Sequence, residues 1–188
     1  MILEDPLAQD TLSRSLHDVG LAAWFGGTLA NAVALNPASA EADNAPATGR
    51  VANTGWNRWT PVNAAAIGAH LAGSIGQLVG NRSRVAAQQG VGTMALAKTG
   101  LTAAALGVTG YSRLLGRTVA TDTSVPAASG TESTVDTPTD VARGQKQLSA
   151  LQWVVPALTG ALIVLSAFAG EQQRLSAVKK GVLARFTR

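Results

Sequence analysis

Residues 147–170 read QLSALQWVVPALTGALIVLSAFAG, and these 24 positions contain no Asp, Glu, Lys or Arg. A transmembrane helix needs about 20 largely apolar residues, because each residue adds about 1.5 Å toward roughly 30 Å of hydrocarbon. Three more windows are nearly as free of charge: 22 residues between Asp18 and Glu41, 23 between Arg58 and Arg82, and Arg84 to Arg113, which encloses only Lys98. The sequence therefore predicts an all-α protein with a bundle of four transmembrane helices, at about 18–36, 62–80, 91–111 and 150–170.

The composition of the whole chain agrees with this prediction. Only 14% of the 188 residues are charged, against about 25% in soluble domains. The alternative, a soluble Ala-rich four-helix bundle, would show a charged face at every helical repeat, and these windows show none. The first window does not resemble a cleaved signal peptide, because Glu4, Asp5 and Asp10 precede it in place of a basic region. The net charge of +4 does not indicate a nucleic-acid partner.

The segments between the spans set the expected topology. We expect residues 1–17 to be a cytoplasmic N-terminal segment, 112–149 a largely disordered external loop, and 171–188 a basic amphipathic tail helix on the cytoplasmic face. Loop 37–55 is expected to be irregular. Eight basic residues fall on the side of the termini and six on the other, so the positive-inside rule places both termini in the cytoplasm of a multi-pass plasma-membrane protein. Four aromatic side chains are expected at one membrane interface: Trp56, Trp59, Tyr111 and Trp153.

Small residues predict how the helices pack. Membrane helices associate where small side chains let their backbones approach closely. The second span carries a small residue at every fourth position, and the third span also contains glycines. The predicted packing residues are therefore Gly68, Ala72, Gly76, Gly80, Gly100 and Gly107. These ridges serve packing within the chain, or one of them docks a membrane-protein partner or a second copy.

Polar side chains at membrane depth are the candidate site. Intramembrane polar groups are functional candidates by default, and the predicted pocket consists of Asn31, Asn63, His70, Gln77, Lys98 and Thr102. The rise per residue predicts two polar layers, one around His70 and one around Lys98, with Lys98 extending toward Asp18 or Glu171. The structural alternative for His70 is a neutral imidazole that bonds a neighbouring Thr or backbone carbonyl.

Cofactor sites and catalytic motifs find little support in the sequence. The predicted spans separate His17 from His70 by roughly 16 Å along the membrane normal, which argues against a haem held by both, although a haem shared with a partner stays open. No Cys is present, and no Asp or Glu is expected near His70, so no metal site is predicted. No Ser/His/Asp set, carboxylate pair or phosphate-binding loop is recognised, so enzymatic activity is not indicated and any cofactor is unknown.

Two resemblances accompany these patterns. The stretch LHDVGLAAWFGG (16–27) resembles the opening helix of copper-resistance D-like membrane proteins, although the chain lacks the Cys and Met-rich ligands of a copper transporter. The stretches GWNRWTPVNAAAIGAHL, AKTGLTAAALG and LQWVVPALTGAL resemble an uncharacterised actinobacterial family of four-span membrane proteins. That second resemblance covers most of the chain and implies the same four-span fold.

Two functional hypotheses follow from the sequence. The leading one is a small integral membrane protein that acts through helix packing, as an accessory subunit of a larger respiratory or envelope complex. The alternative is a small-molecule or ion carrier with a polar pocket around His70 and Lys98.

Overall fold

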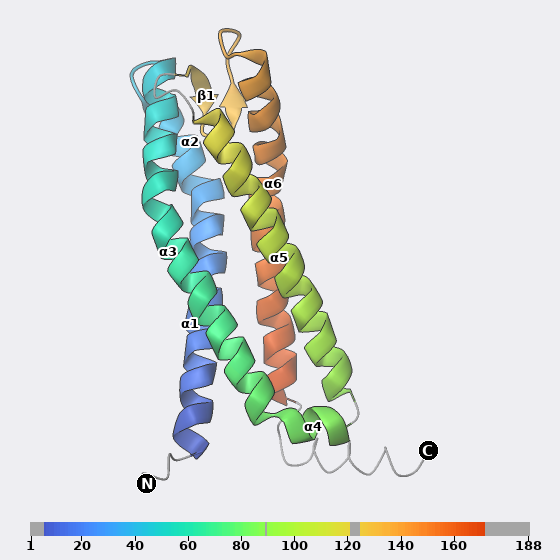
Figure 1. Ribbon diagram of the computed structural model, residues 1–188. Coiled ribbons are helices and arrows are strands. Elements are labelled where there is room, and N and C mark those ends of the chain that lie inside the picture. Colours follow the sequence, from blue (N-terminus) through green and yellow to red (C-terminus); the bar gives the residue numbers. More distant parts are fainter. Residues whose placement is uncertain (1–5, 89, 121–124, 172–188) are drawn as a thin grey trace.

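The four long helices of the computed structural model run side by side between two ends of a bundle (Figure 1). The structure describes residues 6–88, 90–120 and 125–171. Helix α1 continues through a π-helical turn (η1), α2 and a 3₁₀ turn (η2) to Glu41. The elements in chain order are α1 (Pro6–Ala30), η1 (Asn31–Leu35), α2 (Asn36–Ala38), η2 (Ser39–Glu41), α3 (Ala45–Gly80), α4 (Arg82–Ala87), α5 (Val91–Val119), β1 (Ala127–Ser129), β2 (Glu132–Ser133) and α6 (Thr139–Glu171).

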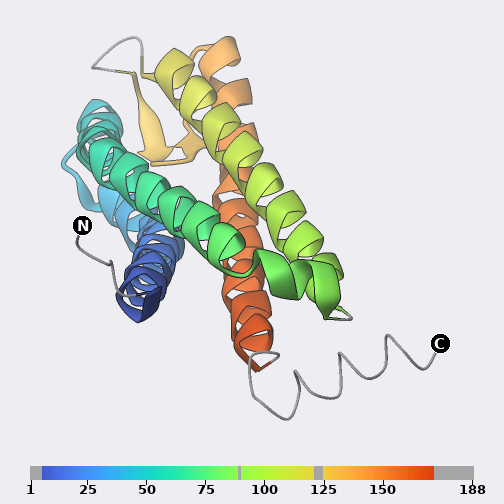
Figure 2. The ribbon, with the colours of Figure 1, turned by 60° about the horizontal axis from the view of Figure 1, so that its bottom comes forward.

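The order of the long helices across the bundle is α3, α1, α6, α5. Helix α1 packs against both α3 and α6, and α6 packs against α5, whereas α3 and α5 make few direct contacts. Helix α1 begins and α6 ends at the end of the bundle where α4 lies, and the β1–β2 hairpin lies at the other end (Figures 1 and 2). We call these the α4 end and the hairpin end. The central core consists of Leu21, Trp24, Ala66, Ala105, Val155 and Leu162.

The predicted fold class is confirmed. Within the described residues, four helices are long and apolar enough to cross a membrane: α3, α5, α6 and the continuous helix Thr11–Glu41. Each is longer than its predicted span, because a helix continues past the hydrocarbon boundary wherever its backbone hydrogen bonds can still form. The predicted tail helix 171–188 lies almost wholly outside the described residues.

The sequence predicted that the first span ends at Asn36, just before Pro37, but the helix continues past both residues. The backbone N–H of Asn36 bonds the carbonyl of Asn31, five residues back, so the helix widens into a π turn just before the proline. Proline ends an α-helix because it lacks an N–H and clashes with the carbonyl four residues earlier. The wider turn relieves that conflict, and the helix continues through the predicted irregular loop. The same helix also begins at Pro6, so most of the predicted N-terminal segment is helical.

The second helix also begins well before residue 62, the predicted start of the second span. Helix α3 begins at Ala45, where the side chain of Asn44 caps it by accepting from the Ala47 N–H, and it runs through Pro61. The Thr60 hydroxyl donates to the Trp56 carbonyl at 2.8 Å. The restriction that proline places on its predecessor is a bias, and a capped, well-packed helix overrides it.

The segment 112–149 is mostly ordered, which corrects the predicted disordered loop. Helix α5 extends to Val119 and α6 begins at Thr139, with the hairpin between them. The Thr137 hydroxyl donates to the Pro126 carbonyl at 2.7 Å, and the Gly130 N–H donates to the Asn36 carbonyl at 3.1 Å. A composition rich in Ser and Thr suggested disorder, but here the Thr137 hydroxyl satisfies the backbone within the segment, and the Gly130 N–H attaches the hairpin to the bundle.

The α1–α3 contact is closer than side chains would allow. A Cβ at Gly20 would lie 2.5 Å from the carbonyl oxygen of Ala66, and a Cβ at Gly73 or Gly76 would overlap Ser13. Of the predicted ridge on α3, only Gly76 takes part; Gly68 and Gly80 meet nothing within 4 Å, and Ala72 is exposed. The reason is geometric. A repeat of four residues advances by about 40° beyond a full turn at each step, so such a ridge winds around the helix.

Candidate functional site

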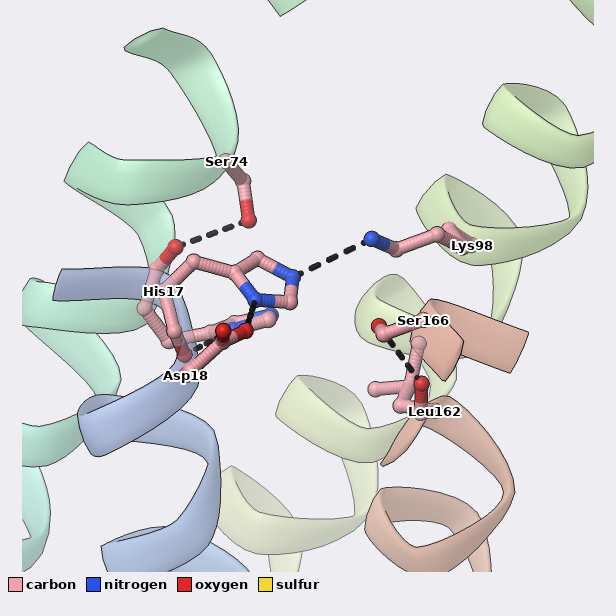
Figure 3. Close-up of polar contacts among 7 residues, drawn as sticks. His17, Asp18, Ser74, Lys98, Leu162 and Ser166 are labelled. Atoms are coloured by element: carbon pink, nitrogen blue, oxygen red, sulfur yellow. Dashed lines mark hydrogen bonds and ion pairs between the residues drawn. The ribbon is translucent and has the colours of Figure 1, made fainter. Parts of the chain in front are cut away.

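His17 lies at the centre of a polar cluster inside the bundle. Its side chain is 1% exposed, and both ring nitrogens have partners (Figure 3). Nδ1 lies 2.7 Å from Oδ1 of Asp18, and Nε2 lies 3.2 Å from Nζ of Lys98. A carboxylate only accepts and an ammonium only donates, so with both charged His17 is neutral with its proton on Nδ1. The three side chains form a continuous hydrogen-bonded chain from the outer face of α1 to α5.

His70 joins this cluster from α3. Its ring centroid lies 4.6 Å from that of His17, at an interplanar angle of 49°. Its Nδ1 lies 3.4 Å from the carbonyl oxygen of His17, and its own carbonyl accepts from the hydroxyl of Ser74 at 2.7 Å. The Nε2 atom is buried and has no hydrogen-bond partner within the described chain. The indole N–H of Trp24, whose ring contacts that of His70, is also buried without a hydrogen-bond partner there. His70 is therefore fully buried with one ring nitrogen unused.

Backbone contact between α1 and α3 brings these residues together. A Cβ at Gly73 would overlap the backbone nitrogen of His17, and a Cβ at Gly20 would lie 2.5 Å from the backbone nitrogen of His70. The two glycines sit at the level of the two histidines, one from each helix. The histidine side chains consequently share a space that bulkier neighbours would fill.

The depth predicted for His17 is wrong. The sequence placed His17 roughly 16 Å from His70 along the membrane normal, and the two rings are in contact. The error comes from starting the first span at residue 18, whereas α1 begins at Pro6 and so presents His17 well inside the bundle. Since Arg58 and Arg82 both lie twelve residues from His70, or about 18 Å at 1.5 Å per residue, the cluster lies midway along the uncharged part of α3.

The two polar layers that the sequence predicted form a single cluster in the structure. Lys98 and His70 both contact His17, so neither stands alone at its own depth. The lysine does reach toward Asp18, but through the imidazole of His17 and not by a direct ion pair. Sequence reasoning placed His70 and Lys98 in the site and named Asp18 as a possible partner of Lys98, but it left His17 and Trp24 out of the site. A usable signal was present, because the buried residues of this helix recur at helical spacing: His17, Leu21, Trp24, Thr28 and Asn31.

The other predicted pocket residues lie elsewhere. Asn63 lines a separate cavity toward the hairpin end. Asn31 is buried in the π turn, Gln77 lies near the C-terminal end of α3, and Thr102 is half-buried on α5. The structure thus brings together only His70 and Lys98 of the predicted set, and it does so through His17.

The four predicted interface aromatics divide into two pairs. Tyr111 and Trp153 are half exposed, and the Tyr111 hydroxyl donates to Gln147 at 2.6 Å. Trp56 instead donates its indole N–H to Asn36 at 2.9 Å, and the ring of Trp59 lies over Gly27 of α1. The last two turn inward because α3 begins seventeen residues before the predicted span, which places them inside a helix that packs on α1.

In residues 6–88, 90–120 and 125–171, no group of three or more His, Cys, Asp or Glu side chains is placed to hold a metal ion. The chain matches no protein-family model, no curated protein and no solved structure. The resemblances to four-span and copper-resistance families therefore stay predictions.

Proposed function

We propose that the protein is a proton-conducting carrier of the cell membrane, in which Asp18, His17 and Lys98 form the relay. The observation that supports it is the hydrogen-bonded chain of three ionisable side chains, level with the middle of the uncharged part of α3. Ionisable groups are expensive at that depth and mark ion or proton pathways. This carries forward the ion-carrier hypothesis, with His17 at its centre in place of the wider pocket.

The relay can move a proton without leaving a net charge in the membrane. Lys98 gives a proton to Nε2 of His17 as Nδ1 of the same ring gives its proton to Asp18. The charged carboxylate and ammonium become a neutral acid and a neutral amine, and the imidazole changes tautomer. The Asp18 side chain is 71% exposed on the outer face of α1, so this end of the relay opens to the outside of the bundle. Lys98 is half-buried on α5, and it takes up the next proton at the opposite end of the relay.

The test is proton flux into vesicles that contain the full chain, a trapped pH-sensitive dye and an imposed potassium diffusion potential. We expect His17→Gln and Lys98→Met to lower the flux to that of protein-free vesicles. A glutamine keeps hydrogen bonds to both neighbours but cannot pass a proton between them. The matched control is Lys146→Met, which removes an exposed lysine of α6. Wild-type flux in folded His17→Gln protein would refute the relay.

The accessory-subunit hypothesis is favoured by a different observation. Helix α5 is the least buried of the four candidate spans. On its outer side a Cβ at Gly100 or Gly107 would meet nothing within 4 Å. Open glycine faces of this kind let another helix approach closely. A partner that copurifies in mild detergent and is lost in Gly107→Leu, but retained in Gly92→Leu, would support this role. Monomeric wild-type protein with no partner would contradict it.

The orientation proposed for either role follows from basic residues. Helix α1 begins, and α6 ends, at the α4 end (Figure 1), where Arg82 and Arg84 lie in the short connection between α3 and α5. The positive-inside rule places this end in the cytoplasm.

A further inference from the structure

A cavity of about 380 Å³ lies between α3, α5 and α6 toward the hairpin end, apart from the histidine cluster. This volume falls in the range of small-molecule sites, about 300–1,000 Å³. We propose that it binds a single-chain amphiphile whose headgroup is an oxygen anion, a carboxylate or a phosphate monoester. The proposal goes beyond the relay and does not depend on it.

The polar part of the cavity holds unused hydrogen-bonding atoms. Five residues that line it carry a buried polar atom with no partner in the described part of the chain: Trp59 Nε1, Asn63 Oδ1, Thr109 Oγ1, Ser112 Oγ and Arg113 Nε. Buried polar groups in proteins are nearly always paired, so a cluster of unpaired ones calls for an explanation. Four of the five can donate a hydrogen bond, and only the amide oxygen of Asn63 is limited to accepting. The set therefore matches a group rich in acceptors.

Arg113 supplies the charge that selects an anion. Its Nη2 donates to Oδ1 of Asn57 at 3.0 Å, which holds the guanidinium at the cavity wall against α3. The amide of Asn57 is neutral, so this contact positions the guanidinium without compensating its charge. Guanidinium bonds to carboxylate or phosphate are among the strongest hydrogen bonds in proteins and are bidentate in many structures.

Toward the bundle centre the cavity is apolar, and it fits a hydrocarbon chain. The lining continues from the polar atoms to Ala64 and Ile67 of α3, Leu106 of α5 and Val155 of α6. On α5 the lining residues between Arg113 and the bundle centre reach back to Leu106, which is about 10 Å at 1.5 Å per residue. An amphiphile with its head at Arg113 would direct its chain toward the membrane centre, the orientation of a bilayer lipid.

The cavity is reachable from the side of the bundle. Helices α3 and α5 make few direct contacts, and α6 forms the wall behind them. Two lining glycines of α5 leave the wall open, since a Cβ at Gly110 or Gly116 would meet no atom within 4 Å. A lipid-soluble ligand can therefore enter between α3 and α5 from the hydrocarbon.

Binding of defined probes to the purified full chain in neutral detergent tests the proposal, with the tryptophan fluorescence as the signal. The anionic probes are oleate and dodecyl phosphate, and the neutral control is mono-olein. We expect at least one anionic probe to bind more than about tenfold more tightly than mono-olein, because a hydrogen bond to a charged group is worth about tenfold or more in affinity. Because oleate and mono-olein share one acyl chain, the difference between them reports the carboxylate, and dodecyl phosphate shows whether a phosphate monoester binds as well.

Matched variants separate the headgroup from the chain. Arg113→Gln should weaken the anionic probe about tenfold or more, whereas Arg117→Gln removes an exposed arginine one turn further along α5 that does not line the cavity and should leave binding unchanged. Gly110→Leu fills the cavity and should lower the binding of all three probes. Circular dichroism and gel filtration confirm that each variant is folded. Equal affinity for mono-olein and both anions, equal effects of the two arginine variants, or no binding of either anion would overturn the proposal. Proton flux measures the relay separately.

Discussion

The backbone of α1 at His17 lies directly against Gly73 of α3, with no side chain between the two helices. This contact sets the depth at which the two histidines meet. It also holds α1 and α3 together as a pair. Lys98 of α5 then connects this pair to α5 through its contact with His17.

Gly73→Val should destabilise the protein by about 1–3 kcal/mol, because the added side chain overpacks a backbone contact. The matched control is Gly68→Val on the same helix, where nothing lies within 4 Å of a Cβ. The two substitutions have the same intrinsic cost to the helix, so their difference reports the contact. Thermal unfolding in detergent, followed by circular dichroism, measures it. Equal losses in the two variants would show that α1 and α3 do not meet here.

Gly27→Ala should displace the ring of Trp59, because a Cβ at that position would overlap the indole. We expect a shift in the tryptophan emission spectrum and a lower affinity for cavity ligands, since Trp59 lines the cavity. Gly26→Ala is the control, because the neighbouring glycine has nothing within 4 Å. An unchanged spectrum in Gly27→Ala, with the protein folded, would contradict the packing of Trp59 on α1.

Asn36→Ala should cost about 1–3 kcal/mol for each buried group that it leaves unpaired. The Asn36 side chain accepts from the indole of Trp56 at 2.9 Å and donates to Gln152 at 2.7 Å, so it links three helices at the hairpin end. Thr54→Ala, at an exposed position of α3, should change the stability by no more than about 0.5 kcal/mol. Denaturant titration of both variants decides whether Asn36 has this linking role.

Ser83→Cys and Ser133→Cys should be labelled from opposite sides of the membrane. Both positions are exposed, Ser83 in α4 and Ser133 in the hairpin, and the chain has no other cysteine. A membrane-impermeant maleimide added to intact cells should label only the hairpin position, and both should react after lysis. Labelling of both positions in intact cells would contradict the four-span topology, and labelling of Ser83→Cys alone would reverse the orientation.

The fold class could be predicted from the sequence because it depends on local composition. A window such as 147–170 is apolar whatever it packs against, and α6 forms around it. The ends of the helices could not be predicted in this way. Hydropathy counts residues 6–17 as polar and therefore starts the first span too late, whereas the backbone hydrogen bonds of a helix continue regardless of polarity.

The candidate site could be predicted only in part for the same reason. His70 and Lys98 stood out as polar residues in apolar windows, but their meeting point depends on the register between helices. That register is set by Gly20 and Gly73, and one sequence contains many glycines at similar spacing. The cavity depends on the separation of α3 and α5 toward the hairpin end, which no spacing in either helix encodes.

The connection between α3 and α5 turns at Gly90, which has the one positive φ angle in the described chain, 83°. Helix α5 then runs for 29 residues, about 43 Å at 1.5 Å per residue. When a helix of that length changes its tilt at the α4 end, its other end moves much further than its start. By this geometry a tilt of about 5° at Gly90 displaces the far tip by about 4 Å, so small adjustments near Arg82 and Arg84 are magnified where Arg113 faces Asn57.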